Sequence, residues 1–582
     1  MPGESSYGSV GSLAPEARPQ PARRALWPVA LASLVLVVGG LRRARGPSAA
    51  AAAAAPASLE ATPAERRRRQ HRREERDALS DDGDDEWSFS AFSYSYEVVL
   101  TYEDFLDDAK VTAFLEEVGV DYAAMLDATG GVTDDELFHY VPRELRVQMV
   151  RPDLAKGEIG DDAMEGYVAF DAAYTYDSDI AASYLIVVDY YGRLKTVAPT
   201  YRGSMMYRVG GLKPVNATHF LLAAGEKAAL TGPRFLWDWR EDEWTSLCDG
   251  ATNDVHDIQF AKGSYAIWQM SNDEQIKRWD AHTGEILTKF SVPHGDDVNH
   301  CQLVEDDGVA FVSSRLTNGL VKMNATTGDR IWVLGGEYGD FELEDFDGTV
   351  HAAGAALWVG QHNLEYFGED EYFMLDNQYD TGNNSRMLIV KVESEGATKR
   401  ARLDWQKTFE GYSPHFGDAD LLPTGNVFGC YWPDAVKSSW DVQYDERAYE
   451  VARDDDATLV WMLSLSGKQC EETVCARSDS SGWSFYSIER FYTAPLVYRV
   501  TCSGTSISFS TQNNFKQSDQ YRGKYDLVDA DSGDALASGD FYWAAYWRET
   551  SVEISLDSLP TDRVRLLVTN QFGDTTRKAF SC

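Results

Sequence analysis

Positive charge is scarce in this 582-residue chain, in which 54 lysines and arginines face 93 aspartates and glutamates. The formal net charge of −39 argues against a nucleic-acid-binding protein, because the phosphate backbone would be repelled. An anionic substrate would need local positive groups to offset this field, so each arginine near a candidate site matters. The length predicts two or more folded units with tails.

Cysteine is also scarce, and the seven cysteines form no Cys-x-x-Cys pair and no zinc-type spacing with histidine. The sequence therefore predicts no metal site. Four cysteines cluster late in the chain, and a Cys502–Cys582 bridge would tie the ends of one small domain; Cys470 and Cys475 are the other disulfide candidates. Cys301 is predicted to be a buried small side chain rather than a reactive thiol.

Histidine is rare too, with ten residues, and two of them fall in a repeat. The segment around His256 recurs 44 residues later around His300, and the same offset relates the Thr-Gly-acidic turns at 283–285 and 327–329. A period of about 40–50 residues with several short strands is typical of a β-propeller. Equivalent positions of successive blades face one central channel, so histidines in register are expected to converge on its axis.

The N-terminal part has the composition of tails and tethers. Residues 1–24 are predicted to be a disordered tail, and residues 42–90 a low-complexity charged linker. Between them, an uncharged apolar run from Ala25 to Leu41 has arginines on both sides. Its length fits a signal-peptide core or a transmembrane signal-anchor. We expect entry into the secretory pathway, with the rest of the chain lumenal, extracellular or secreted.

The remaining chain is predicted to be all-β. Residues 91–165 form a small mixed region of unknown role, residues 166–468 a propeller, and residues 490–582 an immunoglobulin-like β-sandwich, because short apolar runs broken by Gly, Asp and Asn prevail. Three Asn-x-Ser/Thr triplets support the secretory prediction modestly and give candidate glycosylation sites at Asn216, Asn324 and Asn383.

Several short motifs, taken in order, resemble the arylsulfotransferase family. They are the strand and turn at 185–192, the pair His300 and Arg315, the run 331–336 with Asp340-Phe341, Gln361-His362, Leu375-Asp376-Asn377 and 422–426. The resemblance covers residues 166–465, and its order of motifs is specific although no single motif is. It implies a six-bladed propeller that moves a sulfuryl group from an aryl sulfate ester to a phenolic acceptor, with neither phosphoadenosine phosphosulfate nor any other cofactor.

The resemblance also assigns roles to residues. His362 is implied to be the nucleophile that becomes sulfated. On chemical grounds, His256 would protonate the departing phenolate and later deprotonate the acceptor, and His300 and Arg315 would stabilise charge on the sulfuryl oxygens. Further substrate-binding candidates are Gln361, Asn377 and His415, the last of which has no counterpart in the family motif. Gln302 and Gln378 stand where the family usually has Asn and Gly.

Two other interpretations stay open from the residues alone. The first is a non-catalytic propeller-plus-sandwich protein for adhesion or carbohydrate binding, in which the channel residues are unused. The second is a metal site built from the histidines, but they lack a carboxylate or cysteine at ligand-like spacing, and Arg315 would repel a cation. The joint presence of His256, His300, Arg315 and His362 favours catalysis.

Overall fold

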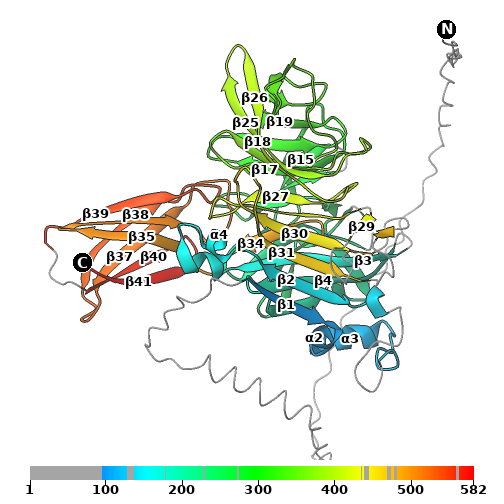
Figure 1. The fold of residues 1–582 in the computed structure, drawn as a ribbon, viewed down its shortest axis with the longest axis horizontal. Coiled ribbons are helices and arrows are strands. Elements are labelled where there is room, and N and C mark those ends of the chain that lie inside the picture. The colour runs from blue at the N-terminus through cyan, green and yellow to red at the C-terminus, as the bar shows by residue number, and fades with distance from the viewer. Residues whose placement is uncertain are drawn as a thin grey trace, which may run out of the picture. The chain divides into compact units, whose positions relative to one another are not determined.

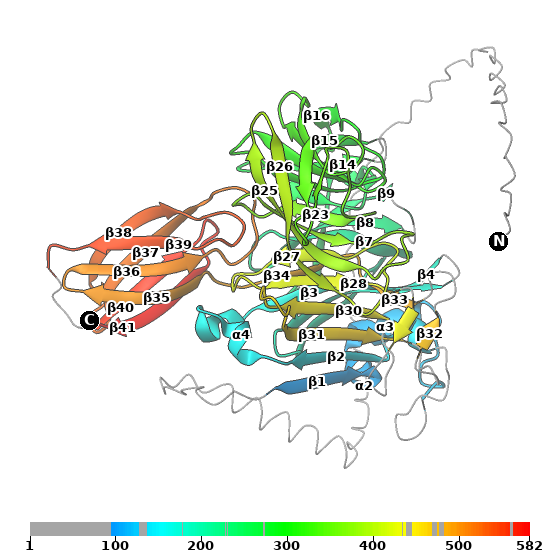
Figure 2. The ribbon, with the colours of Figure 1, turned by 45° about the horizontal axis from the view of Figure 1, so that its top comes forward.

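The computed structural model describes residues 95–126, 137–176, 179–226, 229, 231–271, 274–433, 435–437, 445–467, 474–476, 482–558 and 563–582. Strands predominate over helices throughout this part of the chain (Figures 1 and 2). The predicted tail, apolar run and linker within residues 1–90 lie outside the described residues. Among the described residues, no helix is long and apolar enough to cross a membrane.

Two successive four-stranded antiparallel sheets correspond to the sequence repeat. Their strands follow one another in space as they do in the chain. The first sheet contains β13 (Ile258–Phe260), β14 (Ala266–Ser271), β15 (Gln275–Asp280) and β16 (Ile286–Ser291); the second contains β17 (Val298–Val304), β18 (Val309–Ser314), β19 (Gly319–Asn324) and β20 (Arg330–Leu334).

Larger sheets flank these two on both sides. Those before them consist of β6 (Tyr201–Arg202), β7 (Met205–Pro214), β8 (His219–Glu226), β10 (Arg234–Asp238) and β11 (Glu243–Leu247), with β9 (Thr231–Gly232) and β12 (Asn253–Asp254) as a separate pair. The sheet after them consists of β21 (Phe341–Glu344), β22 (Val350–His351), β23 (His362–Tyr366), β24 (Glu371–Asp376), β25 (Arg386–Glu395) and β26 (Lys399–Thr408). The strands of these larger sheets pair antiparallel except for β21 and β26, which are parallel.

Two further sheets join segments that are far apart in the sequence. One combines β3 (Tyr167–Tyr176), β4 (Asp179–Asp189) and β5 (Leu194–Pro199) with β33 (Gly482–Ser484) and β34 (Ile488–Phe491). The other runs from β27 (Asp418–Leu421) through β28 (Val427–Tyr431), β30 (Glu446–Val451) and β31 (Leu459–Ser466) to β2 (Glu144–Met149) and β1 (Tyr96–Thr101). A short pair, β29 (Ala435–Lys437) and β32 (Val474–Ala476), stands apart.

These pairings cross the boundaries predicted at 165 and 468. Strand β2 pairs with β31 along its whole length, and the blue strands β1 and β2 lie beside it in both views (Figures 1 and 2). Strands β33 and β34 both pair with β3, so the sheet that begins at residue 167 is completed by residues after 481. Sequence periodicity misses such closures because the partners are hundreds of residues apart.

Among the described residues, the α-helices are short and lie before β3. They are α2 (Tyr102–Leu106), α3 (Ala109–Glu117) and α4 (Pro152–Lys156), with the 3-10 turns η1 (Leu137–His139), η2 (Gly160–Met164) and, further along, η3 (Cys248–Gly250). Phe105, Phe114 and Leu115 of the first two helices are buried in the same hydrophobic core as β4 and β31. The expected small mixed region is therefore continuous with the neighbouring sheets in its packing.

The inner strands of the sheets contact one another in a closed series. Strand β7 contacts β13, β13 contacts β17, β17 contacts β23 and β23 contacts β27. The Ile488 amide of β34 donates to Asp418 of β27, and β34 in turn contacts β7. Charged and polar side chains on these strands, such as His300, Glu365 and Glu489, are buried, so they face one another rather than solvent.

The repeated turns have the chemistry that the sequence predicts. Between β15 and β16, the Asp280 carboxylate accepts hydrogen bonds from the Thr283 amide and hydroxyl, and Gly284 has a positive φ of 71°. Between β19 and β20, Asn324 accepts from two backbone amides in the same way. An Asx-type turn followed by a left-handed glycine fixes each hairpin.

The register of the two histidines differs from the prediction. The Gln259 side chain bonds both backbone groups of Leu303, and Gln302 does the same to Tyr366, so these glutamines are the equivalent positions. They are 43 residues apart, not 44. Consequently His300 is equivalent to Asp257, and the prediction that His256 and His300 share a register is wrong.

One extra residue explains the slip. The connection between β18 and β19 is one residue longer than that between β14 and β15, so the turns recur after 44 residues and the first two strands after 43. The pairing of β17 with β18 is also irregular between Val298 and His300. When the two repeats are aligned without gaps on their turns, His300 is matched to His256 instead of Asp257. In a strand, a shift of one residue places the side chain on the opposite face of the sheet.

The C-terminal residues form two sheets over one core. Strands β35 (Leu496–Ser503), β36 (Ser506–Gln512) and β39 (Thr550–Ser555) make the first, and β37 (Arg522–Asp529), β38 (Ala535–Tyr542), β40 (Arg563–Thr569) and β41 (Thr575–Ser581) make the second. Buried side chains from both sheets, including Phe509, Trp543 and Leu566, form a common hydrophobic cluster. A disulfide joins Cys502 to Cys582. Cys470 lies outside the described residues.

Candidate active site

His362 begins β23 and is buried, with only 4% of its surface exposed. Its Nδ1 lies 2.7 Å from the Asn377 side-chain oxygen. The Asn377 amide nitrogen donates to the backbone carbonyls of Ser413 and Phe416, so the Asn377 oxygen is an acceptor and Nδ1 carries the proton. Nε2 therefore keeps its lone pair, and it has no hydrogen-bond partner among the described residues.

The charge state of His362 agrees with this tautomer. Burial lowers the pKa of His362 to about 3, and the positive charges of Arg315, His415 and His256 act in the same direction against the Asn377 hydrogen bond. An imidazole with this pKa is neutral at physiological pH. It is thus a nitrogen nucleophile held in one orientation by an uncharged partner.

His256 has the opposite electrostatic setting. Its Nδ1 lies 2.8 Å from the Asp254 carboxylate, and Asp254 also accepts from the His256 backbone amide. Burial by itself would lower the pKa of His256, but the hydrogen bond and charge of Asp254, with a further contribution from Asp297, raise it above the usual value. His256 is therefore suited to carry and release a proton near neutral pH.

Tyr486 contacts both of these histidines. Its ring centroid lies 5.7 Å from that of His256 and 6.3 Å from that of His362, each in an edge-on arrangement. The Tyr486 hydroxyl donates to the Asn299 carbonyl at 3.3 Å, and its backbone amide donates to the Asp171 carboxylate. The ring thus contacts both histidines, and its backbone amide and its hydroxyl are both held by hydrogen bonds.

Two arginines supply positive charge at this place. Arg315 follows β18; its guanidinium donates to Asp297 at 2.7 Å and lies 4.7 Å from the centroid of the Tyr379 ring. The Arg315 Nε is buried and has no partner among the described residues. Arg208 of β7 lies 4.2 Å from the centroid of the Phe416 ring, which itself packs on Tyr486, and its positive charge opposes protonation of His256.

We call His256, His362, Arg208, Arg315 and Tyr486 the histidine centre. Its members come from five separate places in the sequence and act on one another through ring contacts or charge. Oxyanions are bound by guanidinium groups and imidazoles in such settings. The centre combines a neutral nucleophile, a protonated acid and two cations, which is a set suited to transfer of an anionic group.

His300 does not join the histidine centre. Its Nδ1 lies 3.0 Å from Asp257 Oδ2, and the same carboxylate accepts from the Cys301 amide. Its charge acts on Glu365, which is further along the inner strands. The one-residue shift in register accounts for this position, because it directs His300 to the place where Asp257 lies on the preceding strand.

Gln361, His415 and Asn377 have different roles in the structure. The fully buried Gln361 donates to Ser313 and to the Ser314 carbonyl, so it ties β23 to the preceding sheet. His415 is half-buried, packs on the Trp432 ring at 5.1 Å and lowers the pKa of His362 through its charge. Asn377 orients His362, as described above.

Sequence reasoning missed Arg208, Tyr486 and Asp254. Arg208 and Tyr486 lie outside the two matched repeats, and Tyr486 falls between the predicted propeller and sandwich, so periodicity carried no signal for either. Asp254 stands two residues before His256, where an Asx-type bond to the following backbone is a common local pattern. That spacing could have identified it.

A second charged group lies on the same inner strands. Lys516 Nζ lies 2.9 Å from Glu365 and 2.6 Å from Asp420, and 3.9 Å from Glu489. Lys213 Nζ lies 3.6 Å from Asp257 and 3.9 Å from Glu489. Nearby carboxylates outweigh the effect of burial and raise the pKa of both lysines. We call these six residues the lysine–carboxylate cluster.

The remaining predicted sites stay predictions. Asn216 and Asn324 use their side-chain oxygens to close local turns, while Asn383 is exposed and the Ser385 of its triplet is buried. Within the described ranges, no group of three or more His, Cys, Asp or Glu side chains is arranged to hold a metal ion. Cys301 is buried, and burial raises the pKa of its thiol well above the usual value.

No family model matches the chain, and no curated protein matches it in sequence. Solved structures with some likeness include the β-propeller domain of Cps50 (Swd1) from Myceliophteria thermophila, at 12% identity, with 56% of this chain and 97% of that chain covered and a TM-score of 0.31. A functionally unknown protein from Desulfotomaculum acetoxidans gives 11% identity, 53% and 90% coverage and a TM-score of 0.30. TM-scores this low assign no function.

Proposed function

We propose that this chain is an aryl-sulfate sulfotransferase that works by a ping-pong mechanism through a sulfohistidine. In this proposal the sheets built on β7, β13, β17, β23, β27 and β34 are the blades of a six-bladed propeller, and the C-terminal sheets form an immunoglobulin-like sandwich. The observation that carries the proposal is His362, a neutral imidazole whose Nδ1 is held by Asn377 and which lies close enough to Arg315 for that charge to lower its pKa.

The first half-reaction begins at His362. Its Nε2 lone pair attacks the sulfur of the aryl sulfate, the N–S bond forms, and the S–O bond to the aryl group breaks with its electron pair going to oxygen. His256 gives a proton to the departing phenolate, which leaves as the phenol. Arg208 and Arg315 hold the sulfuryl oxygens and offset their negative charge.

The second half-reaction reverses these steps with another phenol. His256, now neutral, accepts the proton of the acceptor hydroxyl, whose oxygen attacks sulfur while the N–S bond breaks. The electron pair returns to His362 Nε2, and the aryl sulfate product leaves. The raised pKa of His256 suits the group that must exchange a proton, and the lowered pKa of His362 suits the nucleophile, which must stay unprotonated at Nε2.

His300 takes a revised role in this proposal. It pairs with Asp257 and thereby stabilises the connection between β12 and β13 that carries His256, instead of touching the sulfuryl group. The proposal also retains the secretory location and the membrane or signal segment at residues 25–41. The Cys502–Cys582 disulfide supports an oxidising compartment.

The decisive test uses 4-nitrophenyl sulfate with a phenol acceptor. We expect wild-type protein to release nitrophenolate and to gain one sulfuryl group when the acceptor is omitted, with the adduct mapped by mass spectrometry to His362. His362→Ala should abolish both, whereas His300→Ala should retain the adduct. An adduct on His415 would move the nucleophile within the site. Absence of any adduct and of release would leave the non-catalytic binding protein as the better interpretation.

A further inference from the structure

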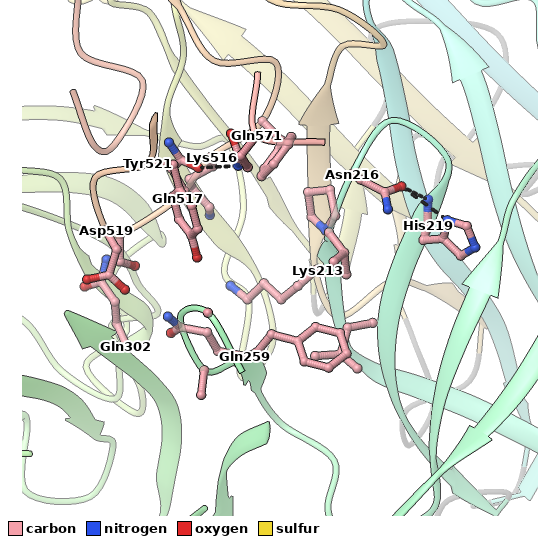
Figure 3. Close-up of a pocket in the computed structure, with 18 of the residues that line it drawn as sticks. Lys213, Asn216, His219, Gln259, Gln302, Lys516, Gln517, Asp519, Tyr521 and Gln571 are labelled. Carbon is pink, nitrogen blue, oxygen red and sulfur yellow. Dashed lines mark hydrogen bonds between the residues drawn. The ribbon is translucent and has the colours of Figure 1, made fainter. Parts of the chain in front are cut away.

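A cavity of about 570 Å³ lies at the end of the inner strands where the lysine–carboxylate cluster is found. The loops after β7 and β13 form part of its wall, and the segments 515–521 and 571–572 of the C-terminal sheets complete it. Figure 3 shows Lys213 extending from one wall towards the middle of this space, with Tyr521 and Gln517 on the opposite side. Two domains therefore enclose one space of a size typical for small-molecule sites.

Most of the wall is apolar and aromatic. The lining includes Leu221, Leu236, Phe260, Tyr265, Phe515 and Phe572. Two of these rings are partly exposed at the surface, Tyr265 at 42% and Phe572 at 49%. Flat aromatic walls favour a ring-containing ligand, since stacking adds to the apolar area that is removed from water.

Two polar groups of the lining lack close partners. The carboxylates that Lys213 Nζ faces lie at 3.6 and 3.9 Å, which is beyond hydrogen-bond length, so its N–H groups remain available. His300 Nε2 is buried and has no partner among the described residues. Both side chains line the cavity, and both face the same Asp257 carboxylate through their other contacts.

Asp257 determines which ring nitrogen of His300 is open to a ligand. Burial would favour the neutral acid, but Lys213 and His300 hold the pKa of Asp257 well below its usual range. The ionised carboxylate lies 3.0 Å from His300 Nδ1, so Nε2 is the ring nitrogen that remains for a ligand. The cavity thus offers a donor on Lys213 and a ring nitrogen on His300, and one hydroxyl group can bond to both.

The charge around the cavity selects a neutral ligand. The ammonium groups of Lys213 and Lys516 already face Asp257, Glu365, Asp420 and Glu489. A carboxylate or sulfate brought among these acids would be repelled by those that are ionised, whereas a neutral hydroxyl satisfies both open groups without adding charge.

We propose that this cavity is a second ligand site, which binds a neutral ring-containing molecule through a hydroxyl group held between Lys213 and His300. The site is distinct from the histidine centre and does not depend on the proposed sulfuryl transfer. Because the C-terminal segments form part of its wall, occupation of the site also tightens the packing of the two domains.

The test measures binding of 2-naphthol to the full chain by calorimetry. We expect 2-methoxynaphthalene, which keeps the rings but cannot donate to His300, to bind at least 10-fold more weakly, and 2-naphthoate to bind more weakly still. His362→Ala should retain the 2-naphthol affinity, which separates this site from the histidine centre. Tighter binding of 2-naphthoate, or no binding of 2-naphthol at millimolar concentration, would overturn the proposal.

Two matched tyrosines locate the site. Tyr265 stacks on His282 with ring centroids 4.1 Å apart and lines the cavity, whereas Tyr338 stacks on His294 at 4.3 Å, is 40% exposed and lies outside the lining. Tyr265→Ala should weaken 2-naphthol binding several-fold, and Tyr338→Ala should leave it unchanged. Equal effects of the two would place the ligand elsewhere. Lys213→Met should weaken binding about 10-fold if circular dichroism shows that it folds.

Discussion

His362 and His300 lie on neighbouring inner strands, yet their partners give them different chemistry. His362 faces the uncharged Asn377 amide, which fixes its tautomer and leaves the ring neutral. His300 faces the ionised Asp257, which Lys213 also approaches. The histidine centre thus leaves the His362 Nε2 lone pair and two cations available, while the lysine–carboxylate cluster pairs its two lysines with carboxylates. By the glutamine bonds described above, His362 occupies the position equivalent to Asn299, one residue before His300.

The largest effect should follow from unbalancing the lysine–carboxylate cluster. Lys516 is 5% exposed and is the close cation for both Glu365 and Asp420. Lys516→Met should lower the free energy of unfolding by about 3–5 kcal/mol, because it leaves buried carboxylates without a cation. Urea unfolding followed by tryptophan fluorescence measures this change.

A surface lysine provides the control for that change. Lys524 pairs with Asp526 and its side chain is 53% exposed, so Lys524→Met should change the unfolding free energy by less than about 1 kcal/mol. Equal destabilisation by the two substitutions would contradict the idea that Lys516 is needed to balance the buried carboxylates of the lysine–carboxylate cluster.

The next largest effect should come from Asn377, the uncharged hydrogen-bond partner of His362. Asn377→Leu removes the acceptor that holds His362 Nδ1 and should lower kcat/KM for 4-nitrophenyl sulfate about 10- to 100-fold, since a buried hydrogen bond of about 1–3 kcal/mol is lost. Asn377→Asp keeps an acceptor but adds charge. It should favour the imidazolium and add a loss of activity at low pH that wild type lacks; an unchanged pH profile would contradict this.

Replacement of Asp254, the charged partner of His256, should change the pH dependence of activity. Burial lowers the pKa of His256, and Asp254 more than compensates for this, so the group stays protonated to higher pH than usual. Activity that needs protonated His256 falls as pH rises through this pKa. Asp254→Asn should therefore shift the alkaline limb of the kcat/KM profile to lower pH, while the acidic limb stays in place. A shift in the other direction would remove His256 as the proton donor.

Local chemistry made some features predictable from the sequence. The Thr-Gly-acidic turns are fixed by bonds within four or five residues, and the late cysteines Cys502 and Cys582 do form a bridge. His362 and its neighbour Asn377 were identified from short motifs, and both lie in the site.

Other features depend on contacts that no local pattern records. The prediction that His256 and His300 share a register was wrong because one extra residue between β18 and β19 makes the turns recur after 44 residues but the first two strands after 43. Arg208 lies on β7, before the matched repeats, whereas Tyr486 lies in the segment after 481 and Lys516 in the connection between β36 and β37. Their roles come from closure of the fold, which brings residues hundreds of positions apart into contact.

The smallest effect concerns Tyr486, the side chain that contacts both histidines. Its ring packs edge-on against His256 and His362, while its hydroxyl makes one bond of 3.3 Å to the Asn299 carbonyl. Tyr486→Phe keeps the ring and should lower kcat/KM by no more than about 3-fold, corresponding to a net hydrogen-bond contribution of about 0.5 kcal/mol. Tyr486→Ala should cost far more, because the spacing of the two imidazoles is lost. If Phe is as damaging as Ala, the hydroxyl itself takes part in the reaction, and the histidine centre contains a second proton donor.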